Sequence, residues 1–372
     1  MAKNDWTSRR LKGYYKFSKK YPSRNAESYA IGESRKMKKK ERARKILFAV
    51  MLCCLFVATF IGVAVSLDLS NRPLENGSQT DEPIISVDNL GTIRAVYVEN
   101  SVLGEISDLS KALKKAKQDG FNAIMLDFKT QEGYLLYGSS VGGYNAVDSV
   151  VIDKIKSEGF ILVARVYCFE DTLAPQRLGA YVYEDAEKTK IWFDAPAING
   201  GRVWLDPTNQ KANNYLCDVI DEVADTGADC IYLESVQFPE ARDGATPVYS
   251  ADDTTLNRNL VLLQFIENAV KEAGRCPVII GVTMDGVDGG NQEKWGGTLF
   301  DTAASICSPM LTPPENSDYI EYIENNYTVM NDRVKNNFST IKVVPTVKNQ
   351  AEDVNFYEKL SKSSAESYII VP

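Results

Sequence analysis

The sequence predicts an α/β protein whose main part is a (β/α)8 TIM barrel, preceded by a single transmembrane helix and a disordered basic N-terminal tail. Three observations predict this arrangement. Residues 91–372 contain eight short apolar segments separated by helical segments, and continuous apolar strands are typical of parallel sheets buried on both faces. Residues 46–67 are 22 consecutive residues without a charge. Residues 1–45 hold 16 Lys and Arg against four acids.

The uncharged segment sets the predicted domain boundaries. As a helix it would extend for roughly 33 Å, enough for a bilayer core. A cleaved signal peptide is the alternative, but its apolar region is usually only about 7–15 residues long. Basic residues flanking a span stay cytoplasmic. We therefore expect a basic cytoplasmic tail at 1–45, a transmembrane helix at 46–67, a polar linker at 68–90 and an extracellular barrel domain at 91–372.

The charge distribution indicates partners for the two ends of the chain. The tail has a net charge of +12, which leaves −20 for the remainder of a chain whose total is −8. Its Lys and Arg, interleaved with aromatic residues, make anionic lipid a candidate partner. The simpler interpretation is a disordered tail that only sets topology, and we expect no nucleic acid partner.

The predicted strands and helices alternate along residues 91–372. Glycines at 159, 227 and 274 mark helix ends, because glycine readily adopts the left-handed conformation after a last turn. A doubly wound open sheet is the structural alternative, and no glycine-rich phosphate loop follows any strand. The predicted strands are 93–98, 122–128, 161–166, 230–234, 278–282, 304–310, 341–346 and 368–371, and the predicted helices are 107–119, 148–158, 213–225, 256–273, 317–337 and 354–361.

The absence of one residue type narrows the chemistry. The chain contains no histidine, which excludes Ser-His and Cys-His nucleophile systems and zinc sites built on imidazole. The seven cysteines show no CxxC spacing and are interpreted as small core residues. A disulfide between Cys230 and Cys276, each before a strand, is the alternative. We expect no metal and no cofactor. Because histidine is absent, carboxylates are the expected catalytic groups if the protein is an enzyme.

The segment Ile231–Pro239, IYLESVQFP, is a short apolar strand that ends in Glu234. In a barrel, residues at the carboxyl ends of strands converge on one mouth. Paired carboxylates there suit glycosidic cleavage, in which one acid protonates the leaving oxygen and the other attacks or activates water. The predicted catalytic residues are Glu234, as nucleophile or base, with Glu170 or Asp285 as general acid. The predicted substrate-binding residues are Asp127, Lys129, Asp206, Trp204, Tyr167 and Gln237.

Several segments together resemble a bacterial family of TIM barrels whose glycoside hydrolase activity is inferred, formerly a domain of unknown function. Residues 204–239 resemble its W-L-D-P start, its helix ending in glycine and its strand of the form F-D-Y-x-R-F-P. Asp127 and Lys129 with Gly133 and Tyr137 resemble its D-x-K…G…Y segment. Residues 308–310 with Pro313 resemble its S-P-M-x-Y-P segment. The resemblance covers most of residues 91–372 and implies a glycoside-hydrolase fold.

The chain departs from the family pattern after its fourth strand. Glu234 stands in place of an aspartate, Ser235 in place of a tyrosine and Gln237 in place of an arginine. After the fifth strand, Thr283 stands where the family often has an acid. Glutamate is one methylene longer than aspartate, so the Glu234 carboxylate is displaced from the position that the family's aspartate would occupy. Small displacements of a catalytic group lower the reaction rate. Losing the arginine removes a cation that would hold a carboxylate ionised.

These observations leave two main functions open. The first is a membrane-anchored glycoside hydrolase that acts on a cell-envelope or extracellular polysaccharide, with peptidoglycan glycan among the candidate substrates. The second is a catalytically inactive barrel that binds envelope glycan or scaffolds partners. A third is a signalling or morphogenesis protein in which the tail is the active part and the barrel a sensor.

Overall fold

The computed structural model describes residues 90–140, 143–242, 244–251, 255–299, 302–314, 317–336, 341–350, 353 and 355–372. These residues fall within one compact unit, 83–372. The predicted tail, the predicted span and all but the last residue of the predicted linker lie outside them. Within the described part of the chain, no helix is both long and apolar enough to cross a bilayer.

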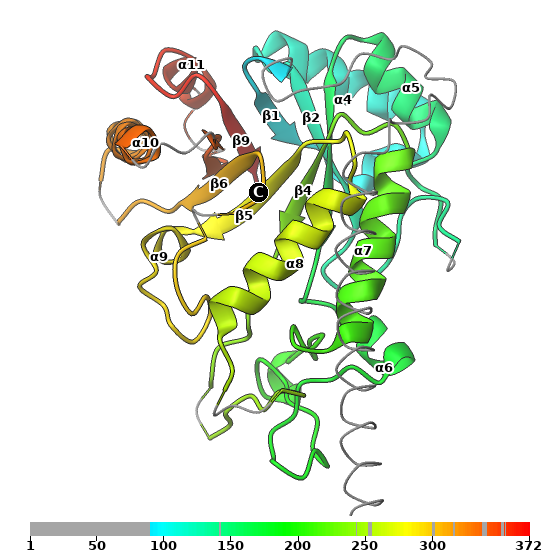
Figure 1. The fold of residues 1–372 in the computed structure, drawn as a ribbon. Coiled ribbons are helices and arrows are strands. Elements are labelled where there is room, and N and C mark those ends of the chain that lie inside the picture. Colours follow the sequence, from blue (N-terminus) through cyan, green and yellow to red (C-terminus); the bar gives the residue numbers. More distant parts are fainter. Residues whose placement is uncertain are drawn as a thin grey trace, which may run out of the picture. The chain divides into compact units, whose positions relative to one another are not determined.

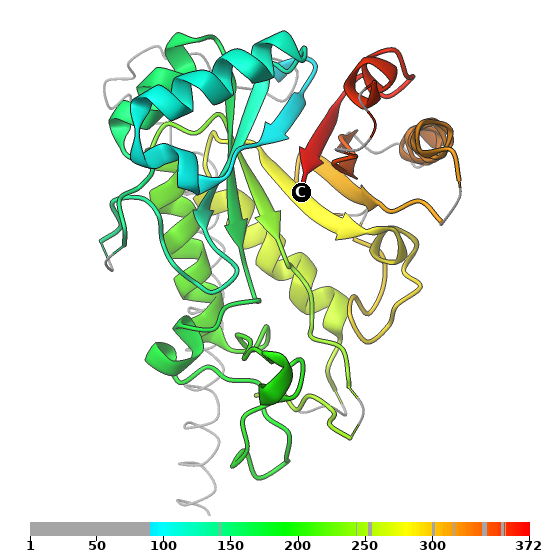
Figure 2. The ribbon, with the colours of Figure 1, turned by 180° about the vertical axis from the view of Figure 1, so that it is seen from behind.

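The strands form a closed, all-parallel barrel with eight strand positions (Figures 1 and 2). Neighbours along the chain pair in order, and the ring closes because the last strand pairs with the first, with Ala95 opposite Ile369. This confirms the predicted barrel over the open sheet. The strands are β1 (Arg94–Tyr97), β2 (Ala123–Lys129), β3 (Ile161–Tyr167), β4 (Cys230–Glu234), β5 (Val278–Thr283), β6 (Ile306–Leu311), β7 (Lys342–Val343), β8 (Thr346–Lys348) and β9 (Tyr368–Val371).

The seventh position is divided into two short strands, whereas one strand was predicted at 341–346. Both β7 and β8 pair with β6, and only β8 pairs with β9. Pro345 lies between them and has no backbone N–H to give to a ladder. Its carbonyl still accepts from Ile369 N at 2.9 Å. The proline therefore interrupts the strand without opening the barrel.

Helices pack on the outside of the barrel, and their starts follow local capping. Asp148 accepts a hydrogen bond from Val151 N, and Asn257 accepts one from Leu260 N, as side chains preceding helices commonly do. The predicted helices appear as α4 (Ile106–Gln118), α5 (Ser149–Ser157), α7 (Gln210–Asp225), α8 (Arg258–Glu272), α10 (Tyr319–Asn336) and α11 (Phe356–Ser361). Four elements of three to five residues were not predicted, because so few residues show no periodicity: η1 (Asn100–Gly104), α6 (Ala174–Leu178), η2 (Ala197–Asn199) and α9 (Met284–Asp288).

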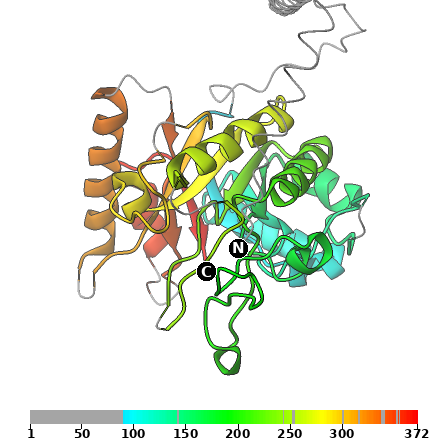
Figure 3. The same ribbon diagram turned by 60° about the horizontal axis from the view of Figure 1, so that its bottom comes forward.

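The strands bury both faces in two separate apolar layers. One layer lies between the sheet and the helices, and the other fills the barrel interior. The interior is apolar towards the amino ends of the strands, with Ile93, Ala123 and Val163 among its residues. Polar side chains occupy the carboxyl ends. The loops after those ends, which include the long connection from β3 to α7, project together beyond the strands (Figure 3).

All five cysteines of the described barrel are free thiols. Cys230 and Cys276 are not joined, so the alternative of a disulfide between them is wrong. Cys276 instead donates to the carbonyl of Ala228 at 3.5 Å, and Cys230 is fully buried. Burial raises the pKa of both thiols, as expected for small core residues.

Candidate active site

A buried ion pair lies inside the barrel near the carboxyl ends of β2 and β3. Arg165 Nε donates to Asp127 Oδ1 at 2.5 Å, and the hydroxyl of Tyr97 donates to Asp127 Oδ2 at 2.9 Å. The guanidinium lies over the rings of Tyr97 and Tyr167, 4.4 and 5.0 Å from their centroids. The pair is adjacent in the sheet because Asp127 and Arg165 are register partners. A fixed cation is thus held among aromatic rings within the barrel.

Glu234 is the last residue of β4 and lies opposite Tyr167 of β3. Its side chain is half-buried. Burial raises the pKa of Glu234, while Arg165 and the backbone N–H of Ser235 act to lower it, and Glu170 and Asp127 raise it further. The net shift is upward, so Glu234 keeps its proton to a higher pH than an ordinary glutamate. Both Glu170 and Asp127 are close enough to act on it electrostatically.

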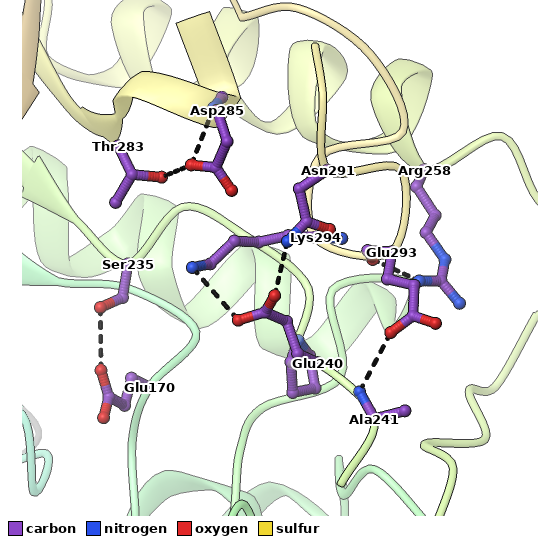
Figure 4. Close-up of polar contacts among 12 residues, drawn as sticks. Glu170, Ser235, Glu240, Ala241, Arg258, Thr283, Asp285, Asn291, Glu293 and Lys294 are labelled. Atoms are coloured by element: carbon purple, nitrogen blue, oxygen red, sulfur yellow. Dashed lines mark hydrogen bonds and ion pairs between the residues drawn. The ribbon is translucent and has the colours of Figure 1, made fainter. Parts of the chain in front are cut away.

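Ser235 follows Glu234 in a left-handed conformation with φ of 56°, which is uncommon for a residue with a β-carbon. Its hydroxyl points towards the loop after β3. There the hydroxyl donates to Glu170 Oε2 at 3.0 Å (Figure 4). This hydrogen bond joins the β3 and β4 loops next to Glu234, and the left-handed backbone at Ser235 is strain of the kind found near functional sites.

Glu170 is a buried carboxylate with donors on both oxygens. Besides Ser235, the amide of Gln131 donates to Oε1 at 2.5 Å, and Arg202 Nη2 lies 2.6 Å from the same oxygen. Burial raises the pKa of Glu170 above its ordinary value, although Arg202 and the hydrogen bonds act to lower it. Glu170 therefore connects three loops at the carboxyl end of the barrel.

Asp285 lies at the start of α9, directly after β5, and is half-buried. Thr283 Oγ1 donates to Oδ1 (Figure 4). The backbone N–H of Gly286 donates to the same oxygen. Burial acts to raise the pKa of Asp285, but the Thr283 hydroxyl, the nearby Lys294 cation and Asn291 outweigh it and hold that pKa below its usual range. Asp285 is therefore ionised under conditions in which Glu234 retains a proton.

Four of the predicted substrate-binding residues are held in internal contacts. Lys129 is fully buried, donates to the Tyr167 carbonyl at 2.7 Å and pairs with Asp171 at 2.8 Å. Trp204 is buried and donates its ring N–H to Asp194 at 3.2 Å.

Asp206 is also fully buried. It accepts from the backbone N–H and hydroxyl of Thr208 at 2.8 and 2.7 Å and from Ser250 N at 2.6 Å. It fastens the loop before α7 to the loop before α8. Asp127 is held in the same way, by Tyr97 and Arg165. Tyr167 and Gln237 are half-buried. Tyr167 lies opposite Glu234 in the sheet, and Gln237 follows Glu234 by three residues in the chain.

Sequence reasoning missed several groups of the site. Arg165 was missed because it lies inside the apolar segment ILVARV and not at the end of a strand, where candidate residues were sought. A charged residue inside a buried strand is unusual, and this could have identified it. Arg202 and Lys294 lie in long loops far from the strands in sequence. Within the described residues, no three or more Cys, Asp and Glu side chains gather as a metal site would require.

The arrangement offers carboxylates with opposite pKa shifts at one end of the barrel. Glu234 and Glu170 are shifted upward, and Asp285 is shifted downward. Titratable groups whose environments separate their pKa values in this way can divide the acid and base roles of one reaction. The site can thus present a protonated acid and an ionised carboxylate at the same pH.

The fold and the sequence define a class of protein. Residues 95–352 match the sequence model of a family described as "Putative glycosyl hydrolase domain". The chain belongs to this family, as its sequence motifs predicted. No curated protein matches the chain significantly.

Several solved structures are similar to this chain at low sequence identity. A hypothetical protein from Ruminiclostridium thermocellum is 18% identical over 50% of this chain and 96% of its own, with a TM-score of 0.43. The glycoside hydrolase domain of PelA from Pseudomonas aeruginosa is 12% identical over 76% and 95%, with a TM-score of 0.43. An alpha-amylase from Lactobacillus plantarum is 10% identical over 75% and 70%, with a TM-score of 0.45.

Proposed function

We propose that this protein is a glycoside hydrolase that uses two carboxylates, with Glu234 as general acid and Asp285 as the ionised partner. The observation that carries the proposal is that both residues lie at the carboxyl ends of the paired strands β4 and β5, with pKa values shifted in opposite directions, in a family of the glycosyl hydrolase type. The sequence alone favoured Glu234 as nucleophile or base. A raised pKa suits the opposite role, because a general acid must hold its proton at the working pH.

In the proposed reaction, Glu234 gives its proton to the glycosidic oxygen as the bond to the anomeric carbon breaks. The Asp285 carboxylate either attacks that carbon or takes a proton from the attacking water. The Arg165 cation stabilises Glu234 once it is ionised. Glu170, bonded to Ser235 beside Glu234, is the alternative acid and fixes the loops that carry the site. Tyr167 and Gln237 are the proposed substrate contacts.

We propose a polysaccharide outside the cell as substrate, in the envelope or beyond it. The support is the sequence of the N-terminal region, where a basic tail at 1–45 precedes the uncharged segment 46–67. In this arrangement the chain spans the membrane once, the tail lies in the cytoplasm near anionic lipid, and residues 91–372 face outwards. Peptidoglycan glycan is accessible there, as are extracellular polysaccharides.

The test is hydrolysis by the purified full-length chain on a panel of peptidoglycan and polysaccharide substrates. We expect reducing ends to appear, and we expect Glu234→Gln to lower the rate by about 10²–10⁴, the usual contribution of general acid–base catalysis. NMR of the first-formed product assigns Asp285: retention of anomeric configuration fits a nucleophile, and inversion fits a base. Full activity in Glu234→Gln would refute the assignment.

A second function is favoured by Ser235 and Gln237, which replace the tyrosine and arginine of the family pattern. An inactive barrel that binds glycan would retain the fold without those groups. It predicts binding of a glycan without release of reducing ends, and equal binding by wild type and Glu234→Gln. Hydrolysis that depends on Glu234 excludes it.

A further inference from the structure

A pocket of about 290 Å³ lies between the loop after β2, helix α6 and the first half of α7. Tyr134 and Tyr144 come from the loop, Leu173 and Arg177 from the segment of α6, and Tyr215 from α7. None of these residues belongs to the carboxylate site. The pocket is built on two of the loops that leave the carboxyl ends of barrel strands.

The pocket gathers three of the large hydrophobic side chains that are exposed in the described parts of the chain. Of the large hydrophobic side chains that are exposed in the described parts of the chain, the aromatic ones are Tyr134 and Tyr144, at 40% and 65% exposure. Their ring centroids are 5.4 Å apart in an edge-to-face arrangement. Leu173, 42% exposed, lines the same pocket. Such concentrations of exposed apolar surface mark binding sites, and rigid aromatic rings give contact area at low entropic cost.

Arg177 adds an available cation to this apolar surface. Its guanidinium lies 4.8 Å from the ring centroid of Tyr215, and its side chain is exposed. It is not part of any ion pair formed among the described residues, unlike Arg165, Arg202, Arg242 and Arg333. The planar guanidinium can donate two parallel hydrogen bonds to a carboxylate. The pocket therefore suits a ligand with an apolar ring face and an anionic substituent.

The backbone around the pocket is fixed before any ligand arrives. Gly133 has φ of 101°, and a β-carbon there would lie 2.2 Å from Asp171 Oδ1. The same oxygen accepts from Leu173 N and Ala174 N at 2.8 and 2.7 Å. Tyr144 N donates to the Leu135 carbonyl at 2.8 Å, which holds the two sides of the loop together. A site built in this way loses little freedom on binding.

The pocket and the carboxylate site are linked through short pieces of chain. Gln131, which bonds Glu170, is three residues from Tyr134, and Glu170 is three residues from Leu173. Three residues reach at most about 11 Å. The two loops that line the pocket are therefore the same two loops that hold Glu170 beside the carboxylate site.

We propose that this pocket is a glycan-binding subsite that receives a carboxylated sugar ring of the same polymer whose neighbouring linkage reaches Glu234. The ring packs on Tyr134 and Tyr144, and its carboxylate pairs with Arg177. The proposal rests on the proposed function for the choice of a glycan as ligand. It adds the substrate class, an acidic polysaccharide, and a place of recognition apart from the reacting bond.

The test is equilibrium binding of tetragalacturonic acid and of the neutral cellotetraose to the full-length chain carrying Glu234→Gln, so that turnover does not interfere. We expect the acidic tetramer to bind at least about tenfold more tightly, with affinity that falls as salt rises. Tyr144→Ala and Arg177→Gln should each weaken that binding about tenfold or more. Both side chains are exposed, so neither change should affect folding, which circular dichroism checks.

Arg275→Gln is the matched control, because Arg275 is also exposed but precedes β5 at the opposite end of the barrel. It should leave binding unchanged. Equal affinity for the two tetramers, unaltered affinity in Tyr144→Ala and Arg177→Gln, or no binding of the acidic tetramer each overturns the subsite. If binding depends on Tyr144 and Arg177 while no glycan is hydrolysed, the subsite stands and the proposed hydrolase activity fails.

Discussion

Arg165 and Asp127 form an ion pair of 2.5 Å inside the barrel, between the rings of Tyr97 and Tyr167. Both charged side chains are about nine-tenths buried. The interior of a TIM barrel is normally filled by apolar layers, so charges there require partners. The pair fixes a cation close to Glu234, whose pKa that cation lowers against the effect of burial. The barrel interior thus contributes directly to the electrostatics of the proposed acid.

Replacing the cation should change both stability and the pH dependence of activity. Arg165→Met leaves Asp127 buried without its counter-ion, and breaking a buried pair in this way costs about 3–5 kcal/mol in the free energy of unfolding. The pKa of Glu234 should rise further, because the group that lowers it is gone. The alkaline limb of the pH–rate profile for kcat/KM should therefore move to higher pH.

The double variant Arg165→Met with Asp127→Asn is the control for this change. It removes the orphaned charge as well, so most of the lost stability should return in urea unfolding. Part of the displacement of the alkaline limb should persist, because the effect of Arg165 on the pKa of Glu234 is larger than the opposing effect of Asp127. An unchanged limb in both variants would contradict the influence of Arg165 on Glu234.

A second buried pair should matter for stability alone. Lys129 and Asp171 are both fully buried, 2.8 Å apart, and Lys129 also donates to the Tyr167 carbonyl. Lys129→Met should lower the free energy of unfolding by about 3–5 kcal/mol. Lys111→Met is the matched control, because Lys111 pairs with Asp108 at the same 2.8 Å on the surface and is 77% exposed. Chemical denaturation should show no measurable change for that control.

The sequence was a good guide to the barrel because parallel strands leave a strong pattern. Cys230–Glu234 and Tyr368–Val371 appear with the predicted bounds, since each is an apolar segment preceded by a polar turn. Pro345 was included in one predicted strand because its neighbours are β-branched and apolar. The break there depends on a missing N–H in a particular ladder position, which the apolar pattern does not reveal.

The site was harder to predict, because the sequence shows which residues end strands but not what each side chain contacts. Glu234 and Asp285 were found from their positions after β4 and β5. Lys129 was predicted to lie at the mouth of the barrel. It instead pairs with Asp171, which is 42 positions away in the sequence, and a register shift in β2 lies between Asp127 and Lys129. Long-range pairing of this kind has no local signature in a single sequence.

Glu234→Gln should stabilise the fold at neutral pH while it removes activity. The folded-state pKa of Glu234 lies above the unfolded value, so the folded protein holds this proton to higher pH. Stability from this group is therefore present below about pH 4 and is lost as pH rises through the folded pKa. Glutamine has no such loss. The variant should melt at the same temperature as wild type near pH 4 and at a higher temperature at pH 7, as calorimetry can measure.

Asp285→Asn is the informative comparison for that experiment, because the pKa of Asp285 is shifted the other way. Its ionised form is stabilised by folding, and the stability from it is present above the unfolded pKa and lost as pH falls through the folded one. The variant should melt below wild type at pH 7, and the difference should shrink in acid. Equal behaviour of the two variants would contradict the opposite shifts on which the proposed roles depend.

Gly133 should tolerate no side chain, which tests the framework shared by the site and the aromatic pocket. Gly133→Ala places a β-carbon in a left-handed conformation and against the Asp171 carboxylate, 2.2 Å from Oδ1. Gly159→Ala is the matched control, because its φ of 83° is also positive but nothing lies within 4 Å of the added carbon. Backbone strain alone costs about 1–3 kcal/mol, which both variants should show in the free energy of unfolding. Gly133→Ala should lose more, since Asp171 must move away from Lys129, Leu173 N and Ala174 N. Equal losses would mean that the loop yields freely and that the pocket is not held in place by Asp171.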